Sequence, residues 1–494
     1  MSNKLTDYVI RYENQRYECL TITLYANILW KDRNVLCLYH GHSLIDEKID
    51  YLINIQKAQL FSVKSYNLNF ILGILKELIQ LPELPGVIDI GQIQDSFDQE
   101  QAMISKETLI AKLWYIHLNS CNNPRDVVLY GFGRIGRLLA RELCSDPAHK
   151  INLNLRAVVT RDPIGIEYLK KRASLLKKDS IHGSFRGSID IDEQTNSLII
   201  NGSPIQFISA QHPAEINYEE LGIHGAILID NTGKFRDKKS LSKHLTCPGI
   251  SKVILTAPAK DLPNIVYGIN HDNINELDSN LYSTASCTTN AITPVLNLLD
   301  KKYGIIKGHI ETIHAYTNDQ NLVDNMHAKS RRGRSAALNM VITETGAGSA
   351  VSKILPKLKD KLTSNAIRVP IANGSLAILM LELKKRTSEN EIHQLLMDEA
   401  TTPGKHKQID ISFEQDLVSS DIIGDPAAAI VDGCATCVSS DGHTVNIYIW
   451  YDNEYGYCMQ VLGFANYLST QINGNIEPVA LIQSANEPSE LTTT

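Results

Sequence analysis

The 494-residue sequence contains no run of about eighteen uncharged apolar residues, and its N-terminus lacks a continuous apolar stretch. The first absence argues against a membrane-spanning helix, and the second argues against a secretory signal peptide. Basic residues are not in excess, because 48 Lys and Arg stand against 55 Asp and Glu and give a net charge of −7. We therefore expect neither a membrane nor a nucleic-acid partner.

The nine cysteines show no spacing typical of a disulfide framework. Cys434 and Cys437 form a lone C-x-x-C with no second pair or histidine partner nearby. A strand with inward-facing thiols is therefore favoured over a zinc site, and no metal is expected. Scattered free cysteines are typical of a reducing compartment, so we expect a cytoplasmic protein.

A chain of this length exceeds a typical single core, which predicts two or three domains. Residues 1–124 differ from the rest: "RNVLCLYHG" predicts a strand over 34–40, and apolar spacing predicts helices over 68–81 and 105–118. The segment holds no catalytic constellation. It is predicted to be a small, mainly helical domain with a structural or regulatory role, and residues 477–494 are expected to be disordered.

The sequence alternates between short apolar strands and helical patterns from Asp126 onward, as in "DVVLYGF", "NLRAVV", "AILIDNTG" and "KVILTAP". This alternation predicts an α/β fold with a parallel sheet covered on both faces. After Cys287 the strands lengthen, as in "GHIETIHAYT", "GSLAILMLELKK" and "TVNIYIWYD". The predicted fold class is thus a Rossmann-type dinucleotide-binding domain plus an α+β catalytic domain with a mixed sheet.

"VVLYGFGRIGRLLARELC" contains G-x-G-x-x-G as Gly131, Gly133 and Gly136, after a strand and at the start of a helix. Glycines there permit a tight turn and close approach to a pyrophosphate, which then faces the helix N-terminus. A tight turn in another α/β protein is the alternative. The next strand ends in Arg161 and Asp162: Asp162 facing the ribose would favour NAD, whereas Arg161 would favour NADP, and the sequence leaves both open.

"STASCTTNAITP" places Cys287 where a helical pattern begins. A thiol becomes a nucleophile when a helix N-terminus or a cation lowers its pKa. The helix must start close to the thiol, because Pro294 is tolerated only in an early turn. His314 lies on a predicted strand and is a candidate partner. A small buried cysteine and a core histidine remain the alternatives on spacing alone.

Taken together, these motifs resemble phosphorylating glyceraldehyde-3-phosphate dehydrogenase over about residues 125–475. The resemblance implies a cofactor domain over 125–286 that is completed by a C-terminal helix over 453–475, and a catalytic domain over 287–452. The motifs that carry it, in chain order, are "GFGRIGR", "DSIHGSF", "KVILTAPAKD", "ASCTTNAITP", "HAYTNDQ", "RRGRSAA", "TETGAGSAV", "AIRVP", "LVSSD" and "WYDNEYGY".

The resemblance implies that Cys287 attacks the aldehyde of glyceraldehyde 3-phosphate and that His314 holds the thiolate as an ion pair and accepts the hydroxyl proton. Oxidation with NAD or NADP would leave a thioester, which inorganic phosphate would cleave to 1,3-bisphosphoglycerate. Thr317, Asp319 and Arg368 would form the substrate-phosphate site, with Asp319 orienting the arginine. The attacking phosphate would contact Ser286, Thr288, Arg332, Thr345 and Gly346.

The same resemblance implies the cofactor contacts and a homotetramer. The implied cofactor residues are Gly131, Phe132, Gly133, Arg134, Ile135, Gly136, Arg161, Asp162, Thr232, Gly233, Thr256, Asn453 and Tyr457. "HAYTNDQ" also resembles the erythrose-4-phosphate dehydrogenase branch, which uses water as the acceptor. The N-terminal extension is absent from the common short enzyme, so a regulatory or moonlighting binding protein is a further alternative.

Overall fold

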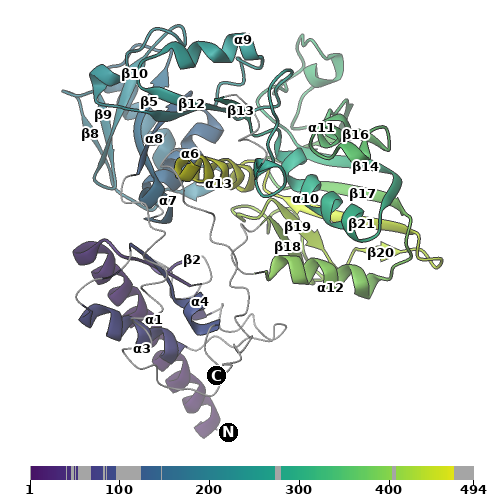
Figure 1. Cartoon of the computed structure of the whole chain (residues 1–494), viewed down its shortest axis with the longest axis horizontal. Helices are drawn as coiled ribbons and strands as arrows, with labels where there is room; N and C mark the ends of the chain where they lie inside the picture. The colour runs from purple at the N-terminus through teal and green to yellow at the C-terminus, as the bar shows by residue number, and fades with distance from the viewer. Residues whose placement is uncertain are drawn as a thin grey trace, which may run out of the picture. The chain divides into compact units, whose positions relative to one another are not determined.

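A computed structural model gives the arrangement of the chain (Figure 1). It divides the chain into two compact units, 1–122 with 470–494 and 123–469, which are considered separately below. The structure describes residues 2–39, 42–45, 68–81, 86–95, 124–145, 147–272, 280–402 and 408–471, with positions 49, 52, 53 and 84.

The N-terminal unit combines helices with a small sheet. Its described elements are α1 (Ser2–Arg33), β1 (Leu36–Tyr39), β2 (His42–Ser43), α3 (Leu68–Gln80), β3 (Val87–Asp89) and α4 (Ile90–Asp95). β1 pairs antiparallel with β2 and parallel with β3, and α1 packs against α3 and β1. The strand and first helix predicted here are present. The helix predicted over 105–118 and the tail over 477–494 lie outside the described residues.

The dinucleotide-binding half of the second unit is built on an eight-stranded sheet in the order β13-β12-β11-β4-β5-β10-β9-β8. The six strands from β13 to β10 are parallel, and β9 and β8 add antiparallel. The strands are β4 (Arg125–Tyr130), β5 (Leu153–Thr160), β8 (Ile189–Asp192), β9 (Ser197–Ile200), β10 (Ser203–Ser209), β11 (Ala226–Asp230), β12 (Ile250–Leu255) and β13 (Leu281–Ser283), with a separate pair β6 (Lys178–Asp179) and β7 (Gly183–Ser184). The predicted parallel sheet is confirmed.

Helices α6 (Arg134–Ser145), α7 (Pro147–Asn152), α8 (Ile166–Lys177) and α9 (Lys238–Leu241) belong to the same half. α13 (Tyr455–Gln471) also packs into its core, because Val461, Leu462 and Phe464 are buried with Leu138, Leu139 and Ile229. Figure 1 shows α13 beside α6, although more than three hundred residues separate them in the chain. The C-terminal helix therefore completes this half.

The catalytic half contains a mixed sheet in the order β15-β16-β14-β17-β21-β19-β18, with β20 paired to β21. α10 packs against β14, β17, β19 and β21 through Ile292, Val295 and Leu299. The strands are β14 (Ile305–Ala315), β15 (Val341–Thr343), β16 (Leu362–Val369), β17 (Ser375–Leu383), β18 (Ile409–Ser412), β19 (Ala429–Asp432), β20 (Cys437–Val438) and β21 (Thr444–Tyr451), and the helices are α10 (Cys287–Lys302), α11 (Ala347–Ile354) and α12 (Glu389–Ala400).

Strand register gathers one end of this sheet around His314. His314 is paired with Arg368 of the parallel strand β16, and Ser375 is paired with Tyr451 of β21. Ile313, next to His314, lies opposite Leu376 of β17. Side chains that are far apart in sequence therefore meet at this edge. Among the described residues, no helix is long and apolar enough to cross a membrane.

Candidate active site

The glycine-rich turn has the shape that a dinucleotide requires. Gly131 has a φ of +99°, which favours glycine, and a Cβ on Gly136 would collide with the carbonyl oxygen of Gly131. A Cβ on Gly133 would meet nothing within 4 Å, so open space lies beside this residue. The turn leads directly into α6, whose first N–H groups are available to a pyrophosphate. These three residues fit a bound dinucleotide.

The other residues of the motif have structural contacts. Phe132 is buried edge-to-face against Phe207, with 5.3 Å between ring centroids. Ile135 packs against the same core. The Arg134 guanidinium forms ion pairs with Asp179 and Glu454, with Nε 2.9 Å from Glu454 Oε1, and these partners raise its pKa despite burial. The Arg134 side chain therefore ties the turn to the C-terminal motif, while its backbone faces the predicted pyrophosphate site.

Asp162, just after β5, forms an ion pair with Arg172 that the sequence did not predict. Arg172 Nη2 on α8 lies 3.2 Å from Asp162 Oδ2, and its guanidinium stacks 4.7 Å from the Tyr168 ring centroid. Arg161 contributes its carbonyl oxygen, which accepts from Gln211 Nε2 at 2.8 Å. A cationic side chain therefore sits against the carboxylate that would face an adenosine ribose.

Thr232, Gly233 and Thr256 come together after β11 and β12. Asp230 Oδ1 accepts from the backbone N and the hydroxyl of Thr232 at 2.8 and 2.7 Å. Gly233 has a φ of +62°, and Thr256 donates to the Asp230 carbonyl oxygen at 3.1 Å. The other Asp230 oxygen lies 3.0 Å from Nε2 of the fully buried His244. Asp230 thus holds the loop in which the predicted cofactor-lining residues lie.

Cys287 is the first residue of α10, as the sequence predicted. The Ser286 hydroxyl caps the helix by accepting from the Thr289 backbone N at 3.1 Å and lies 2.7 Å from the Thr289 hydroxyl. Ser286 therefore helps to start the helix at the thiol, besides its predicted role with phosphate. The helix N-terminus stabilises negative charge on the sulfur.

Cys287 and His314 are in contact, with 3.5 Å between Sγ and Nε2. On the other side of the ring, Nδ1 lies 2.7 Å from the Ala315 carbonyl oxygen. The carbonyl oxygen only accepts and so favours a proton on Nδ1, whereas Arg368 Nη1, 2.9 Å from the same nitrogen, only donates and favours a lone pair there. With the proton on Nδ1, Nε2 can accept a proton from Cys287 or from a group bound there.

The pKa shifts in this pair favour the neutral forms. Burial raises the pKa of the Cys287 thiol, although the positive Arg368 and hydrogen bonds at Thr288 partly oppose this. Burial lowers the pKa of His314 to about 3, and Arg368 acts in the same direction. The expected thiolate–imidazolium pair is thus disfavoured here. The main cause is the burial of both groups, and Arg368, which faces the imidazole, adds to it by opposing a second positive charge on His314.

Arg368 reaches over the imidazole from β16. Its Nη1 lies 2.9 Å from His314 Nδ1 and donates to the Ala315 carbonyl oxygen at 2.7 Å and to the Thr317 hydroxyl at 3.3 Å. Its Nε is buried without a hydrogen-bond partner. Burial and the positive charge of Arg332 both lower the pKa of Arg368. The site thus contains two nearby cations and an unsatisfied donor.

Asp319 has a different partner from the one predicted. Its carboxylate forms an ion pair with Arg332 and accepts from the Thr317 hydroxyl. No direct bond joins it to Arg368 among the described contacts, but the Thr317 hydroxyl contacts both groups, and that Asp319 orients Arg368 stays a prediction. Arg332 lies in the segment before β15, and its Nε donates to the Thr343 hydroxyl at 3.1 Å. Asp319 therefore links the two predicted phosphate sites by orienting Arg332.

Thr345 and Gly346 form the start of α11. Gly346 is the N-cap residue, and the Thr345 hydroxyl accepts from the Ala347 backbone N at 3.2 Å. Gly346 is exposed and Thr345 is half-buried. The two residues present the beginning of a second helix, an arrangement compatible with the predicted phosphate contact.

Asn453 lies in the segment that leads into α13, and Tyr457 lies in the first turn of that helix. Asn453 Oδ1 accepts from the Ser375 hydroxyl at 2.7 Å, and Ser375 Oγ accepts from the Ala315 backbone N at 3.1 Å. Asn453 is thereby linked to the residue after His314. The Tyr457 hydroxyl is buried, 2.8 Å from the Thr284 hydroxyl, and donates to the Ala285 carbonyl oxygen at 3.2 Å. Tyr457 thus supports the turn before Cys287.

Two residues of the same motif were not predicted as site residues. The hydroxyl of Tyr451, a buried residue, lies 3.0 Å from the hydroxyl of Thr288, which follows the nucleophile. Asp452 is buried and lies 2.9 Å from His182 Nε2 and 2.7 Å from Asn373 Nδ2. Both were present in "WYDNEYGY", but only the tertiary structure shows what they contact.

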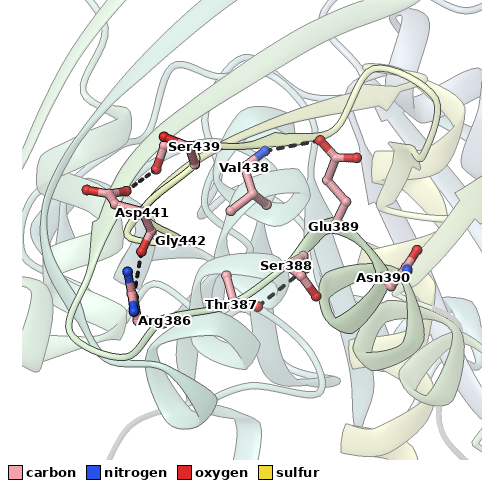
Figure 2. A pocket seen from close by; sticks show the side chains of 10 residues that line it. Arg386, Thr387, Ser388, Glu389, Asn390, Val438, Ser439, Asp441 and Gly442 are labelled. Carbon is pink, nitrogen blue, oxygen red and sulfur yellow. Dashed lines mark hydrogen bonds between the residues drawn. The ribbon is translucent and has the colours of Figure 1, made fainter.

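A separate hollow lies at the opposite end of the catalytic sheet, after β17 and before β21 (Figure 2). Two of its side chains bond to the backbone of other lining residues: Arg386 donates to the Asp441 carbonyl oxygen at 2.8 Å, and Glu389 accepts from Val438 N at 3.4 Å. It contains none of the predicted site residues. Nearby, Cys434 and Cys437 are both exposed, so the prediction of inward-facing thiols was wrong.

Comparison with known proteins agrees with this geometry. Residues 125–238 match the family profile described as glyceraldehyde 3-phosphate dehydrogenase, NAD binding domain, and residues 286–453 match the one for its C-terminal domain. A glyceraldehyde-3-phosphate dehydrogenase-like protein of Pseudomonas aeruginosa (strain UCBPP-PA14) is 48% identical over 446 residues, covering 88% of this chain and 95% of that protein. Fewer than 446 residues follow residue 122, so this match includes part of the segment 1–122.

Two other relatives match about two thirds of this chain and nearly all of their own length. Glyceraldehyde-3-phosphate dehydrogenase 1 of Bacillus cereus is 37% identical over 342 residues, covering 69% of this chain and 97% of that protein. Glyceraldehyde-3-phosphate dehydrogenase 2 of Nostoc sp. (strain PCC 7120 / SAG 25.82 / UTEX 2576) is 40% identical over 341 residues, with the same coverage of 69% and 97%. The chain belongs to the glyceraldehyde-3-phosphate dehydrogenase family of NAD-binding dehydrogenases.

Proposed function

We propose that this protein oxidises glyceraldehyde 3-phosphate to 1,3-bisphosphoglycerate with inorganic phosphate and NAD or NADP, in a reversible reaction. A dinucleotide would lie along Gly131, Gly133 and Gly136, with the loop around Thr232 on its other side. Once bound, this cofactor supplies the acceptor for hydride. The assignment of residues 125–286, with 453–475, to cofactor binding and of 287–452 to catalysis is part of the same proposal.

Cys287 is the proposed nucleophile. His314 Nε2 takes the thiol proton as the sulfur attacks the aldehyde carbon and returns it to the resulting alkoxide, so that a hemithioacetal forms. Nε2 then accepts the hydroxyl proton as hydride leaves for the bound cofactor, and a thioester remains on Cys287. The low pKa of His314 supports this role, because a neutral imidazole with its proton on Nδ1 presents the Nε2 lone pair to the sulfur at 3.5 Å. Ionisation of the thiol relies on the α10 N-terminus and Arg368.

The guanidinium groups of Arg332 and Arg368 are the main support for two phosphate sites. Arg368 is half-buried near Arg332 and has a buried Nε without a partner, and such an arrangement is stabilised when anions lie between and around the cations. Attack of inorganic phosphate on the thioester carbon then breaks the C–S bond, releases the Cys287 thiolate and forms the acyl phosphate. This pair of cations, of which Arg368 contacts the histidine beside Cys287, is the observation on which the phosphorolytic reaction rests.

The direct test follows NADH formation from glyceraldehyde 3-phosphate with and without inorganic phosphate. We expect turnover that requires phosphate and is abolished in Cys287→Ser. Asp441→Asn, in the hollow of Figure 2, is the matched control and should behave as the wild type. Phosphate-independent turnover would instead favour oxidation of erythrose 4-phosphate with water as acceptor. That is the second candidate, because "HAYTNDQ" is also typical of that branch.

We further propose that the enzyme is a homotetramer. Support comes from apolar side chains that are exposed in and around the segment leading to β15, including Met326 at 93% and Leu338 at 82% exposure. Side chains of this kind indicate an interface with another copy. The eight cysteines that the structure describes are free thiols, which supports the proposed cytoplasmic location.

A further inference from the structure

Helix α1 carries apolar side chains on two opposite faces. One face packs inside the N-terminal unit, where Cys19, Ile22, Ala26 and Leu29 are at most 1% exposed. The opposite face is exposed. Its large apolar side chains, with their exposed fractions, are Ile10 (53%), Tyr17 (73%), Leu20 (44%) and Leu24 (56%). An amphipathic helix normally has one stripe of apolar side chains, which is buried, so a second, exposed apolar stripe indicates a binding surface.

The exposed stripe follows a heptad pattern. Spacings alternate between three and four residues along positions 10, 13, 17, 20, 24, 27 and 31, which is the spacing that keeps one seam of a helix facing another helix. Apolar residues occupy four of these positions. The other three are Glu13 near one end, Lys31 at the other end and Asn27 between them. The seam is therefore apolar in the middle and oppositely charged at its ends.

We propose that α1 pairs with α1 of a second copy of this chain, in antiparallel orientation and centred near residue 22. In this register Leu20 lies opposite Leu24 of the second copy, and Tyr17 lies opposite its Asn27. Glu13 then meets Lys31 of the second copy. The twofold axis repeats each of these contacts, so two ion pairs flank four leucines.

The charges select both the partner and the direction. A parallel pair would bring Glu13 against Glu13 and Lys31 against Lys31, and like charges at facing positions oppose pairing. The antiparallel pair matches every charge on the seam with its opposite. Residues 13–31 span about 27 Å at 1.5 Å per residue, and their six seam positions form six layers with the second copy. The self-complementarity of the seam thus identifies a second copy as its occupant.

Engineered disulfides in the full chain test this pairing. The double variant Glu13→Cys/Lys31→Cys is made in a Cys434→Ser/Cys437→Ser background, because the native cysteines at 434 and 437 are exposed. Within one chain the two new thiols are about 27 Å apart on one rigid helix, so a disulfide between them must join two copies. Purified protein is oxidised with copper–phenanthroline and analysed on a non-reducing denaturing gel.

We expect a covalent dimer in the double variant, with most of the chain shifted to twice its mass. The background protein and the single variants Glu13→Cys and Lys31→Cys should remain monomeric on the gel. Arg11→Cys/Lys31→Cys is the matched control, because position 11 is exposed but lies on the other side of the helix. Dimerisation of Glu13→Cys alone would indicate parallel pairing and overturn the proposal, as would failure of the double variant to cross-link.

A charge reversal gives an independent measurement. In the Cys434→Ser/Cys437→Ser background, the double variant Leu20→Cys/Leu24→Cys reports on pairing at the centre of the seam. Adding Glu13→Lys should slow its cross-linking severalfold, and adding Lys31→Glu as well should restore the rate. Equal rates in all three proteins would overturn the register. Dehydrogenase activity is measured alongside and should not change, so this test and the test of the proposed function fail independently.

Discussion

Replacing Arg368 with glutamine should raise the pKa of the Cys287 thiol. The guanidinium contacts His314 Nδ1 at 2.9 Å, and the ring's other nitrogen lies 3.5 Å from Sγ, which places the positive charge on the order of 8 Å from the sulfur. At an effective dielectric constant of about 20, Coulomb's law gives roughly 2 kcal/mol in favour of the thiolate. Arg368 favours the thiolate, so its loss raises a pKa that burial has already raised.

The assay is the pH dependence of Cys287 alkylation by iodoacetamide, which is uncharged and does not itself respond to the guanidinium. Below the thiol pKa, the rate in Arg368→Gln should be lower than in the wild type by about tenfold to thirtyfold, and the profile should move to higher pH. Arg332→Gln is the control, because Arg332 pairs with Asp319 and is not among the main influences on the thiol. Superimposable wild-type and Arg368→Gln profiles would refute this account of thiol activation.

Three further substitutions test the cofactor site. Arg172→Ala should lower kcat/KM for NADP by about threefold to tenfold while leaving or improving that for NAD, because the cation beside Asp162 is lost. A parallel fall with both cofactors would contradict this, and steady-state kinetics with each cofactor decides. Gly136→Ala should destabilise the fold by about 1–3 kcal/mol and weaken dinucleotide binding, since its Cβ collides with the backbone of Gly131. Gly133→Ala should weaken binding with little change in thermal stability, and equal melting temperatures for both variants would count against the distinction.

Local patterns in the sequence were sufficient for much of the second unit. "DVVLYGF" became β4, the helix predicted after it became α6, and Cys287 is the first residue of α10 as expected. These elements follow from short apolar strands, glycine positions and a helix cap, which act over a few residues. The positions of Gly131 and Gly136 were predictable for the same reason.

Contacts between distant residues were not predictable in this way. Asp319 could have paired with either nearby arginine, and only the tertiary structure shows that Arg332 is its partner. The sequence also did not indicate that Arg134 would meet Glu454, 320 residues away. Helix α1 was missed because its apolar residues lie on two opposite faces, which weakens the periodicity that a single buried face produces.

The position of Asn453 depends on its buried neighbour, and replacing that neighbour should change cofactor binding. Asp452 accepts from the backbone N of Gly424, Glu454 and Tyr455, each at 2.8 Å, besides its contacts with His182 and Asn373. Burial would raise the pKa of Asp452, but hydrogen bonds and the charge of His182 lower it on balance. Its stabilising effect is therefore present above the ordinary aspartate pKa and is lost as the pH falls through the lowered one.

Asp452→Asn keeps the shape but removes this charge and places an amide N–H₂ among the donors. Because hydrogen bonds to charged groups contribute about 1.5–3 kcal/mol each, we expect a loss of at least about 2 kcal/mol in the free energy of unfolding. The peptide segment that includes Asn453 is fixed by these bonds, so KM for the cofactor should rise more than kcat falls. Calorimetry and steady-state kinetics at neutral pH measure the two effects, with the exposed Asp441→Asn as the control. Lower stability with an unchanged cofactor KM would mean that Asp452 stabilises the fold without positioning Asn453, since a displaced segment could not leave cofactor binding intact.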